Sequence, residues 1–351
     1  MKKFIIKTLF YLIPFCFFYG AYKVSSPRFS GDIGALGMIS FGYEYVDNME
    51  KNFPPDNLTV DTVITSSDKL QIADASKVYV IGDSFSKQRI SGYQNYLARL
   101  LGFKVININT SNPSTLSAEN PFGLSARLLN SGYLDSSNCR ILILESVDRD
   151  IIYYLKNIEN EFERTYQLPD TKHHNKKDAN KNSELYNVLS FMRLKIDYDN
   201  PIYKRELKRE YFTHNYFSKT LFHYKDDMNF LKTLKADMEK TKENLIRLNQ
   251  KFSDNGIKLI ILIAADKYDV YRPFMVDDTL PVDTTTNRLS DISGVCVIDT
   301  KLMLQKMVQK GEKDVYMVND THWSYKASEA VASKLADVID SLGISVSPYL
   351  N

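Results

Sequence analysis

The chain has 351 residues, of which 44% are hydrophobic and 25% are charged, a composition typical of a folded protein rather than a disordered one. Its 45 basic and 43 acidic residues leave a formal net charge of +2, so the charge balance gives no reason to expect nucleic-acid binding. The three cysteines show no CxxC spacing, which argues against a disulfide-dense scaffold and against a structural zinc site.

The N-terminus is typical of a membrane anchor. Three lysines among the first seven residues precede an apolar run of 15 residues over 8–22. A spanning helix needs about 20 residues, which the run reaches only if Phe4–Ile6 extend it. We expect residues 1–24 to form an uncleaved signal-anchor helix, with a cleaved signal peptide as the alternative. The rest of the chain would then be exported to the periplasmic or extracellular face.

After a linker over residues 25–76, short apolar runs alternate with helical patterns. Apolar residues in continuous stretches predict strands, and residues spaced three and four apart predict helices. The first half of this pattern comprises strands at 77–81, 103–108 and 140–144, and helices at 94–101 and 124–129.

The second half begins with a charged region, about 152–250, for which we expect a helical insertion. Strands at 258–264 and 295–298 and a closing helix at 324–342 follow. This order predicts an α/β fold with a doubly wound, mainly parallel sheet over residues 77–351. In such a fold the active site lies beyond the carboxyl ends of the strands.

The cysteines allow two interpretations. In an oxidising compartment Cys139 and Cys296 could form a disulfide, which would leave Cys16 in the membrane segment. Both cysteines lie beside apolar strand-like runs, so two separate buried thiols fit the sequence equally well.

The first motif with catalytic character is Gly82-Asp83-Ser84, at the end of the first predicted strand. A serine on a sharp turn from strand to helix exposes its hydroxyl, and its own N–H can face an oxyanion. A serine that only caps the following helix is the alternative.

The second motif is Asp320-Thr321-His322-Trp323, directly before the closing helix. An aspartate two residues before a histidine can accept the Nδ1–H of the imidazole and leave Nε2 as a base. Of the five histidines, His322 is the one that we place beside core elements. The alternative is that Asp320 caps the helix and His322 packs under Trp323. Together the two motifs predict a Ser-His-Asp site.

These motifs resemble those of the SGNH (GDSL-type) hydrolase superfamily. The His-Trp step and the segment 265–271 are similar to elements of the SGNH-like proteins that O-acetylate exported alginate and other polysaccharides. In those proteins the DxHW motif precedes the GDS motif, whereas here it follows, so the chain resembles a rearranged relative. The resemblance implies an SGNH-like three-layer sandwich, with Ser84 as nucleophile, His322 as base and Asp320 as its orienting partner.

The resemblance further implies transfer of an acetyl group to a cell-envelope or capsular polysaccharide, with a multi-pass membrane acyltransferase as the acetyl-supplying partner. A carbohydrate O-acetyl esterase and a non-catalytic polysaccharide-binding or assembly protein are the alternatives. We expect no cofactor and no metal.

The remaining site residues depart from the superfamily pattern or lack a fixed role. Asn112 stands where the superfamily has an oxyanion-hole glycine. Arg149 follows the third strand and could face an acyl oxygen or an acidic sugar, unless it only pairs with Glu145. Lys267 could contact substrate or a carboxylate, or simply lie on the surface. Asp83 and Trp323 complete the residues expected to bind substrate or the oxyanion.

Overall fold

A computed structural model of the chain describes residues 3, 7, 8, 10–16, 59–61, 77–88, 91–102, 104–110, 120–136, 139–165, 202–214, 217–318 and 320–343. Among these residues, no helix has both the length and the apolar character that crossing a membrane requires. Most of the expected anchor, residues 1–24, lies outside the described residues, so the anchor stays a prediction.

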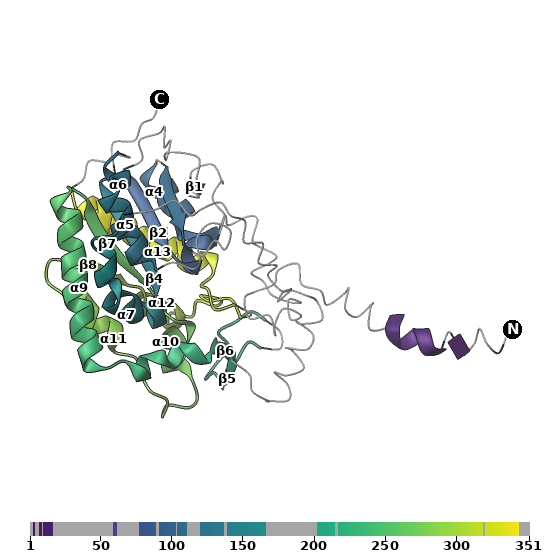
Figure 1. Cartoon of the computed structure of the whole chain (residues 1–351). Helices are drawn as coiled ribbons and strands as arrows, with labels where there is room; N and C mark the ends of the chain where they lie inside the picture. The colour runs from purple at the N-terminus through teal and green to yellow at the C-terminus, as the bar shows by residue number, and fades with distance from the viewer. Residues whose placement is uncertain are drawn as a thin grey trace.

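A six-stranded sheet forms the centre of the fold (Figure 1). All its pairings are parallel. In order across the sheet, the strands are β1 (Thr59–Asp61), β3 (Val105–Asn109), β2 (Val78–Gly82), β4 (Ile141–Val147), β7 (Lys258–Ala264) and β8 (Cys296–Asp299). The five predicted strands are present within a few residues of their expected bounds, and β1 was not predicted. From β2 the chain adds β3 on one side and then β4 on the other, so the order of strand addition reverses at β2. The carboxyl end of β2 is therefore the expected place for a site.

Helices cover both faces of the sheet, which confirms the doubly wound α/β fold. The α-helices are α4 (Tyr93–Leu101), α5 (Pro121–Asn130), α6 (Tyr133–Ser136), α7 (Asp148–Lys156), α9 (Lys235–Asp254), α10 (Lys267–Tyr271), α11 (Thr285–Ser290), α12 (Lys301–Gln309) and α13 (Tyr325–Ser341). Short 3₁₀ segments are η3 (Ser84–Lys87), η5 (Ile158–Glu161), η6 (Lys225–Lys232) and η7 (Arg272–Phe274).

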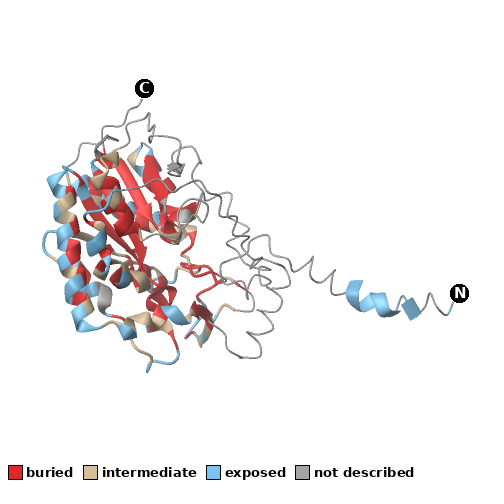
Figure 2. Cartoon of the chain, viewed as in Figure 1, coloured by how far each residue is buried: buried red, intermediate tan, exposed pale blue. Residues whose placement is uncertain are grey.

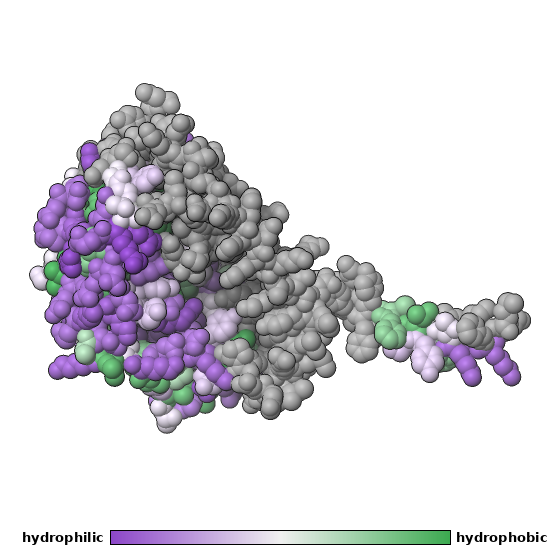
Figure 3. All heavy atoms as spheres, in the orientation of Figure 1, coloured by the Kyte–Doolittle hydropathy of each residue, from purple (hydrophilic) through white to green (hydrophobic). Residues whose placement is uncertain are grey.

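Alternation along the buried strands divides the core in two. In β4, Ile143 packs in a cluster with residues of α4, α12 and α13, whereas Leu144 packs in a second cluster with residues of α5, α7 and α9. Successive side chains of a strand point to opposite faces, so a strand that is buried on both sides must be apolar throughout. Figure 2 shows the sheet buried between its helical layers, and Figure 3 shows the hydrophilic outer face of α9.

The region expected to be a helical insertion contains an antiparallel hairpin instead. Its strands are β5 (Ile202–Glu206) and β6 (Thr220–Tyr224). The helices α7 and α9, also within the expected insertion, pack on the sheet as ordinary crossover helices. The hairpin was not predicted because β5 is rich in charged residues and alternates buried with exposed side chains, so its sequence lacks a continuous apolar run.

The cysteines are separate. Cys139 is buried and Cys296 half-buried, and neither forms a disulfide, so the second of the two interpretations holds in the structure.

Candidate active site

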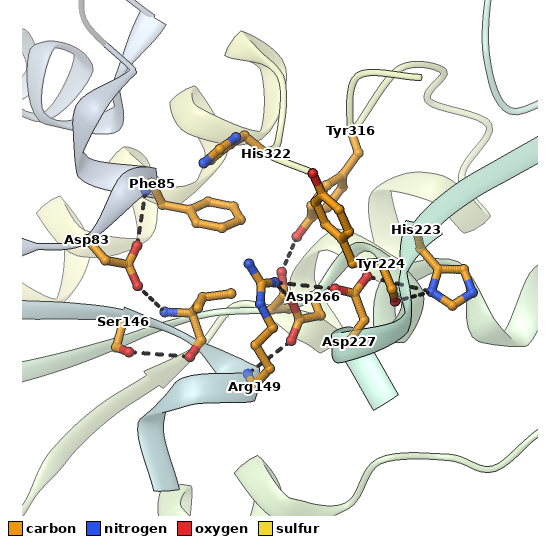
Figure 4. A network of polar contacts seen from close by, with 12 residues as sticks. Asp83, Phe85, Ser146, Arg149, His223, Tyr224, Asp227, Asp266, Tyr316 and His322 are labelled. Atoms are coloured by element: carbon orange, nitrogen blue, oxygen red, sulfur yellow. Dashed lines mark hydrogen bonds and ion pairs between the residues drawn. The ribbon is translucent and has the colours of Figure 1, made fainter. Parts of the chain in front are cut away.

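The candidate nucleophile lies on a sharp turn at the carboxyl end of β2. The strand ends at Gly82, and η3 begins at Ser84. Asp83 holds the turn through its side chain: Oδ1 accepts the Phe85 N–H at 3.1 Å, and Oδ2 accepts the Val147 N–H at 2.8 Å (Figure 4). Because both oxygens accept backbone N–H groups, Asp83 positions the turn; its contact with substrate stays a prediction.

A buried acid, Glu145 of β4, supports the same turn from below. Its Oε2 accepts the Asp83 N–H at 3.0 Å and the Ser86 hydroxyl at 2.8 Å. The Tyr93 hydroxyl lies 3.0 Å from the Ser86 oxygen and extends this network into α4. Burial, followed by the neighbouring Asp83, raises the pKa of Glu145 well above its ordinary value. Sequence analysis treated Glu145 only as a partner for Arg149 and missed this role.

Gly82 is required by this close packing. A Cβ at position 82 would lie 2.1 Å from the Ser86 oxygen and 2.4 Å from Glu145 Oε2, well inside van der Waals contact. Any larger residue would push the turn away from its buried support. The glycine of the GDS motif therefore serves a close approach of side chains to the backbone.

The candidate base lies on the loop before α13. His322 Nδ1 and Asp320 Oδ1 are 2.5 Å apart, and the same oxygen accepts the His322 backbone N–H at 3.0 Å. A carboxylate at this position holds the proton on Nδ1, which leaves Nε2 as the basic atom of the ring. The Asp-x-His spacing thus forms the expected dyad.

Lys267 holds this loop from inside the protein. Its side chain is fully buried, and Nζ donates to the carbonyl oxygens of Met317, Val318 and Asp320 at 2.6, 3.1 and 2.9 Å. Lys267 is therefore neither a substrate contact nor a surface lysine, contrary to both expectations. It is a positioning residue for the loop that bears His322, and only the tertiary structure reveals this.

Trp323 is also part of the scaffold. The indole is fully buried, and its ring packs edge-on against Phe85 and Tyr93 at centroid distances of 4.7 and 6.2 Å. A side chain without exposed surface does not present itself to a substrate, so the expected substrate contact was wrong.

The two loops adjoin at one edge of the sheet. The ring of Phe85, which directly follows Ser84, lies 4.7 Å from the ring of His322. Gln88 Nε2 donates to the Trp323 carbonyl at 2.8 Å and joins the loops a second time. The structure thus brings the turn of Ser84 and the Asp320–His322 dyad into the same region, although they lie far apart in the sequence.

Arg149 lies next to these loops at the start of α7, and its guanidinium reaches toward Asp266 and Asp227 (Figure 4). Nη1 contacts Asp266 Oδ1 and lies 3.3 Å from Asp227 Oδ1. Burial opposes the charged form, but these two carboxylates outweigh it and raise the pKa of Arg149. The alternative pair with Glu145 is absent, because Glu145 is engaged at the nucleophile turn.

Two further histidines are buried near the core, which corrects the premise that His322 stood alone there. His214 and His223 are 1% and 0% exposed. Burial lowers the pKa of His223 to about 3, so the imidazole is neutral and its 3.7 Å approach to Asp227 is not an ion pair at neutral pH. His223 Nδ1 instead lies 2.9 Å from the Tyr224 carbonyl oxygen.

Asn112, the expected oxyanion-hole residue, lies outside the described residues. Its role stays a prediction.

Comparison with known proteins supports an SGNH-type enzyme. Residues 221–348 match the family model described as "SGNH hydrolase-like domain, acetyltransferase AlgX". The match includes the dyad and Lys267, and it agrees with the acetyltransferase branch predicted from the motifs. It supports an enzyme of the hydrolase or acyltransferase type. No curated protein matches the chain.

Proposed function

We propose that the chain is an exported, membrane-anchored serine O-acyltransferase that moves acetyl groups to a hydroxyl of a cell-envelope or capsular polysaccharide. The observation that carries the proposal is the meeting of the Ser84 turn with the Asp320–His322 dyad at the carboxyl edge of the sheet. The family match at residues 221–348 supports the acetyltransferase branch of the fold.

In the first half-reaction, Ser84 Oγ attacks the carbonyl carbon of the acetyl donor while His322 Nε2 takes the hydroxyl proton. The tetrahedral intermediate collapses, the bond to the leaving group breaks, and His322 returns the proton to that group. Asp320 stabilises the imidazolium that exists between these steps. The product is an acetyl ester on Ser84.

In the second half-reaction, a sugar hydroxyl attacks the acetyl-enzyme, and His322 Nε2 takes its proton. Collapse breaks the ester bond to Ser84, and the serine regains its proton from His322. Water in place of the sugar would give the esterase reaction, so the acceptor alone separates the two activities.

Arg149 is a partly exposed cation next to these loops, and we place it at the acyl oxygen or at an acidic group of the acceptor. Its carboxylate partners fix the guanidinium and leave 17% of the side chain exposed. In this proposal a multi-pass membrane acyltransferase supplies the acetyl group, and the N-terminal anchor keeps the enzyme beside it.

The test is acetyl transfer by the purified full-length protein. It is incubated with a chromogenic acetyl ester, with and without an envelope oligosaccharide, and the sugar is analysed by mass spectrometry. We expect acetylated sugar from the wild type and from the control Ser333→Ala, whose serine is exposed on α13, and none from Ser84→Ala.

Fast ester hydrolysis without sugar acetylation would instead establish the esterase. Equal activity of Ser84→Ala and the wild type would exclude Ser84 as the nucleophile. Absence of ester turnover in the wild type would favour a binding or assembly protein on the same fold.

A further inference from the structure

Three buried aspartates converge at the carboxyl side of the sheet, apart from the residues of the proposed reaction. Asp148 begins α7, Asp269 lies in α10, and Asp283 precedes α11 (Figure 1). One carboxylate oxygen from each lies within 4.8 Å of the other two. Their exposed fractions are 4%, 3% and 3%. Because the three residues come from separate segments, their sequence spacing gave no sign of a cluster.

Lys301 is a cation beside the cluster. Its Nζ is buried and donates to the Asp283 backbone carbonyl at 3.0 Å, and its charge acts on Asp148 and Asp269. Arg149, the residue after Asp148, is engaged by Asp227 and Asp266. Carboxylates buried side by side are costly, so a further positive charge would stabilise the fold.

A second observation points to a ligand in the cluster. Oδ2 of Asp148 is inaccessible to solvent and has no hydrogen-bond donor among the described residues. Buried acceptors in native proteins rarely lack a partner, and those that do often mark an ion or a water. Here the acceptor belongs to a side chain that is directed at two other carboxylates.

We propose that Asp148, Asp269 and Asp283 bind one divalent cation, and that this cation is Ca²⁺. Carboxylates alone, without cysteine or histidine, select Ca²⁺, Mg²⁺ or Mn²⁺ over zinc. Ca²⁺ accepts carboxylate oxygens at about 2.3–2.6 Å in flexible geometry. Mg²⁺ demands a near-ideal octahedron and usually keeps several waters, which suits a buried set of three carboxylates less well.

The position of the cluster assigns the ion a structural role. Asp148 directly precedes Arg149, and Asp269 lies two residues after Lys267. A cation that joins α7 and α10 would therefore fix the two helices that present Arg149 and Lys267.

The test is cation binding by the full-length protein after treatment with a chelator. We expect calorimetric titration with CaCl₂ to give one site per chain, and thermal unfolding to shift upward with added Ca²⁺. Asp269→Asn should weaken the affinity at least about tenfold. Asp237→Asn, which changes a carboxylate in a partly exposed pair with Lys156, is the matched control and should bind like the wild type.

Failure of the chelated wild type to bind Ca²⁺, Mg²⁺ or Mn²⁺ would overturn the proposal and show that protons neutralise the carboxylates. Unchanged affinity in Asp269→Asn would overturn it as well. Asp148→Asn is the second variant if Asp269→Asn does not fold. Binding of Mn²⁺ or Mg²⁺ but not Ca²⁺, lost in the variant, would overturn the assignment to calcium.

Discussion

The two loops of the candidate site are held by side chains of opposite hydrogen-bonding character, acceptors at one loop and a donor at the other. At the nucleophile turn, the carboxylates of Glu145 and Asp83 accept backbone N–H groups. At the histidine loop, the ammonium of Lys267 donates to three backbone carbonyls. Each loop is fixed through its main chain rather than through the side chain that reacts.

The difference follows from the direction of the backbone at each place. The nucleophile turn opens a helical segment, where N–H groups lack partners within the helix, so an acceptor stabilises it. The histidine loop turns its carbonyl oxygens inward over residues 317–320, so only a donor can satisfy them. The unpaired main-chain groups of each loop thus decide whether an acceptor or a donor can support it.

The largest effect is expected at the dyad, where the comparison predicts a change of activity without loss of the fold. In Asp320→Asn the amide donates toward Nδ1, so the proton moves to Nε2 and the base is lost. We expect kcat for an acetyl ester to fall about 10⁴-fold. The unfolding free energy measured with denaturant should change by no more than about 1 kcal/mol. A variant that keeps most of its activity would contradict the role of the dyad.

Removal of the ammonium from the histidine loop should affect both stability and catalysis. Lys267→Met leaves three buried carbonyls without their donor, so we expect about 3 kcal/mol less unfolding free energy. Displacement of His322 should lower kcat about 10²-fold, with a smaller change in KM.

The matched control for Lys267→Met is Lys326→Met, whose partly exposed side chain donates to the Glu312 carboxylate and the Lys313 carbonyl rather than to the histidine loop. It should alter stability by about 0.5 kcal/mol or less and leave kcat unchanged. Retention of full kcat by a destabilised Lys267→Met would refute the positioning role.

Crowding of the nucleophile turn tests the other half of the comparison. Gly82→Ala places a methyl group against the Ser86 oxygen and Glu145 Oε2, so we expect a loss of about 2 kcal/mol in unfolding free energy. Activity should fall about tenfold as the turn shifts. In the control Gly123→Ala the nearest atom is Glu161 Cγ at 3.1 Å, the flexible side chain can move, and stability should not fall. Equal unfolding free energies of the two variants would show that the turn accommodates a methyl group at position 82.

The smallest effect is a change in the pH dependence of stability. The pKa of Glu145 is raised in the folded state, so the protonated carboxyl stabilises the fold. This stabilisation is fully present below pH 4.5, the ordinary pKa, and is lost as the pH rises through the folded-state pKa. The side chain of Glu145→Gln cannot ionise. The unfolding free energy of this variant, relative to that of the wild type, should therefore rise by about 1 kcal/mol between pH 5 and pH 8. Urea unfolding at the two pH values measures this, with the exposed Glu243→Gln as control. If the difference in unfolding free energy between Glu145→Gln and the wild type is the same at both pH values, the raised pKa of Glu145 is contradicted.

The sequence predicted what depends on local pattern. Continuous apolar runs located β2, β4 and β7, and the GDS and Asp-x-His motifs indicated Ser84 and the dyad. The supporting residues could not be predicted in the same way. Glu145 binds residues at least 59 positions away in the sequence, and Lys267 binds residues at least 50 positions away. Nothing in the local sequence encodes such contacts.

The expectations that failed did so for a related reason. Trp323 and Lys267 were assigned to the substrate because of the motif beside them, whereas packing buries both. The hairpin of β5 and β6 was missed because β5 alternates buried and exposed residues. His214 and His223 were not expected beside core elements, although both are buried.

The central claim is that Ser84 is a nucleophile activated by His322, and labelling with a serine-directed phosphonate tests it most directly. We predict one adduct, located at Ser84 by peptide mass spectrometry, that is absent in Ser84→Ala and forms about 10³-fold more slowly in His322→Ala. An adduct that persists in Ser84→Ala, or that forms at an unchanged rate in His322→Ala, would contradict the claim.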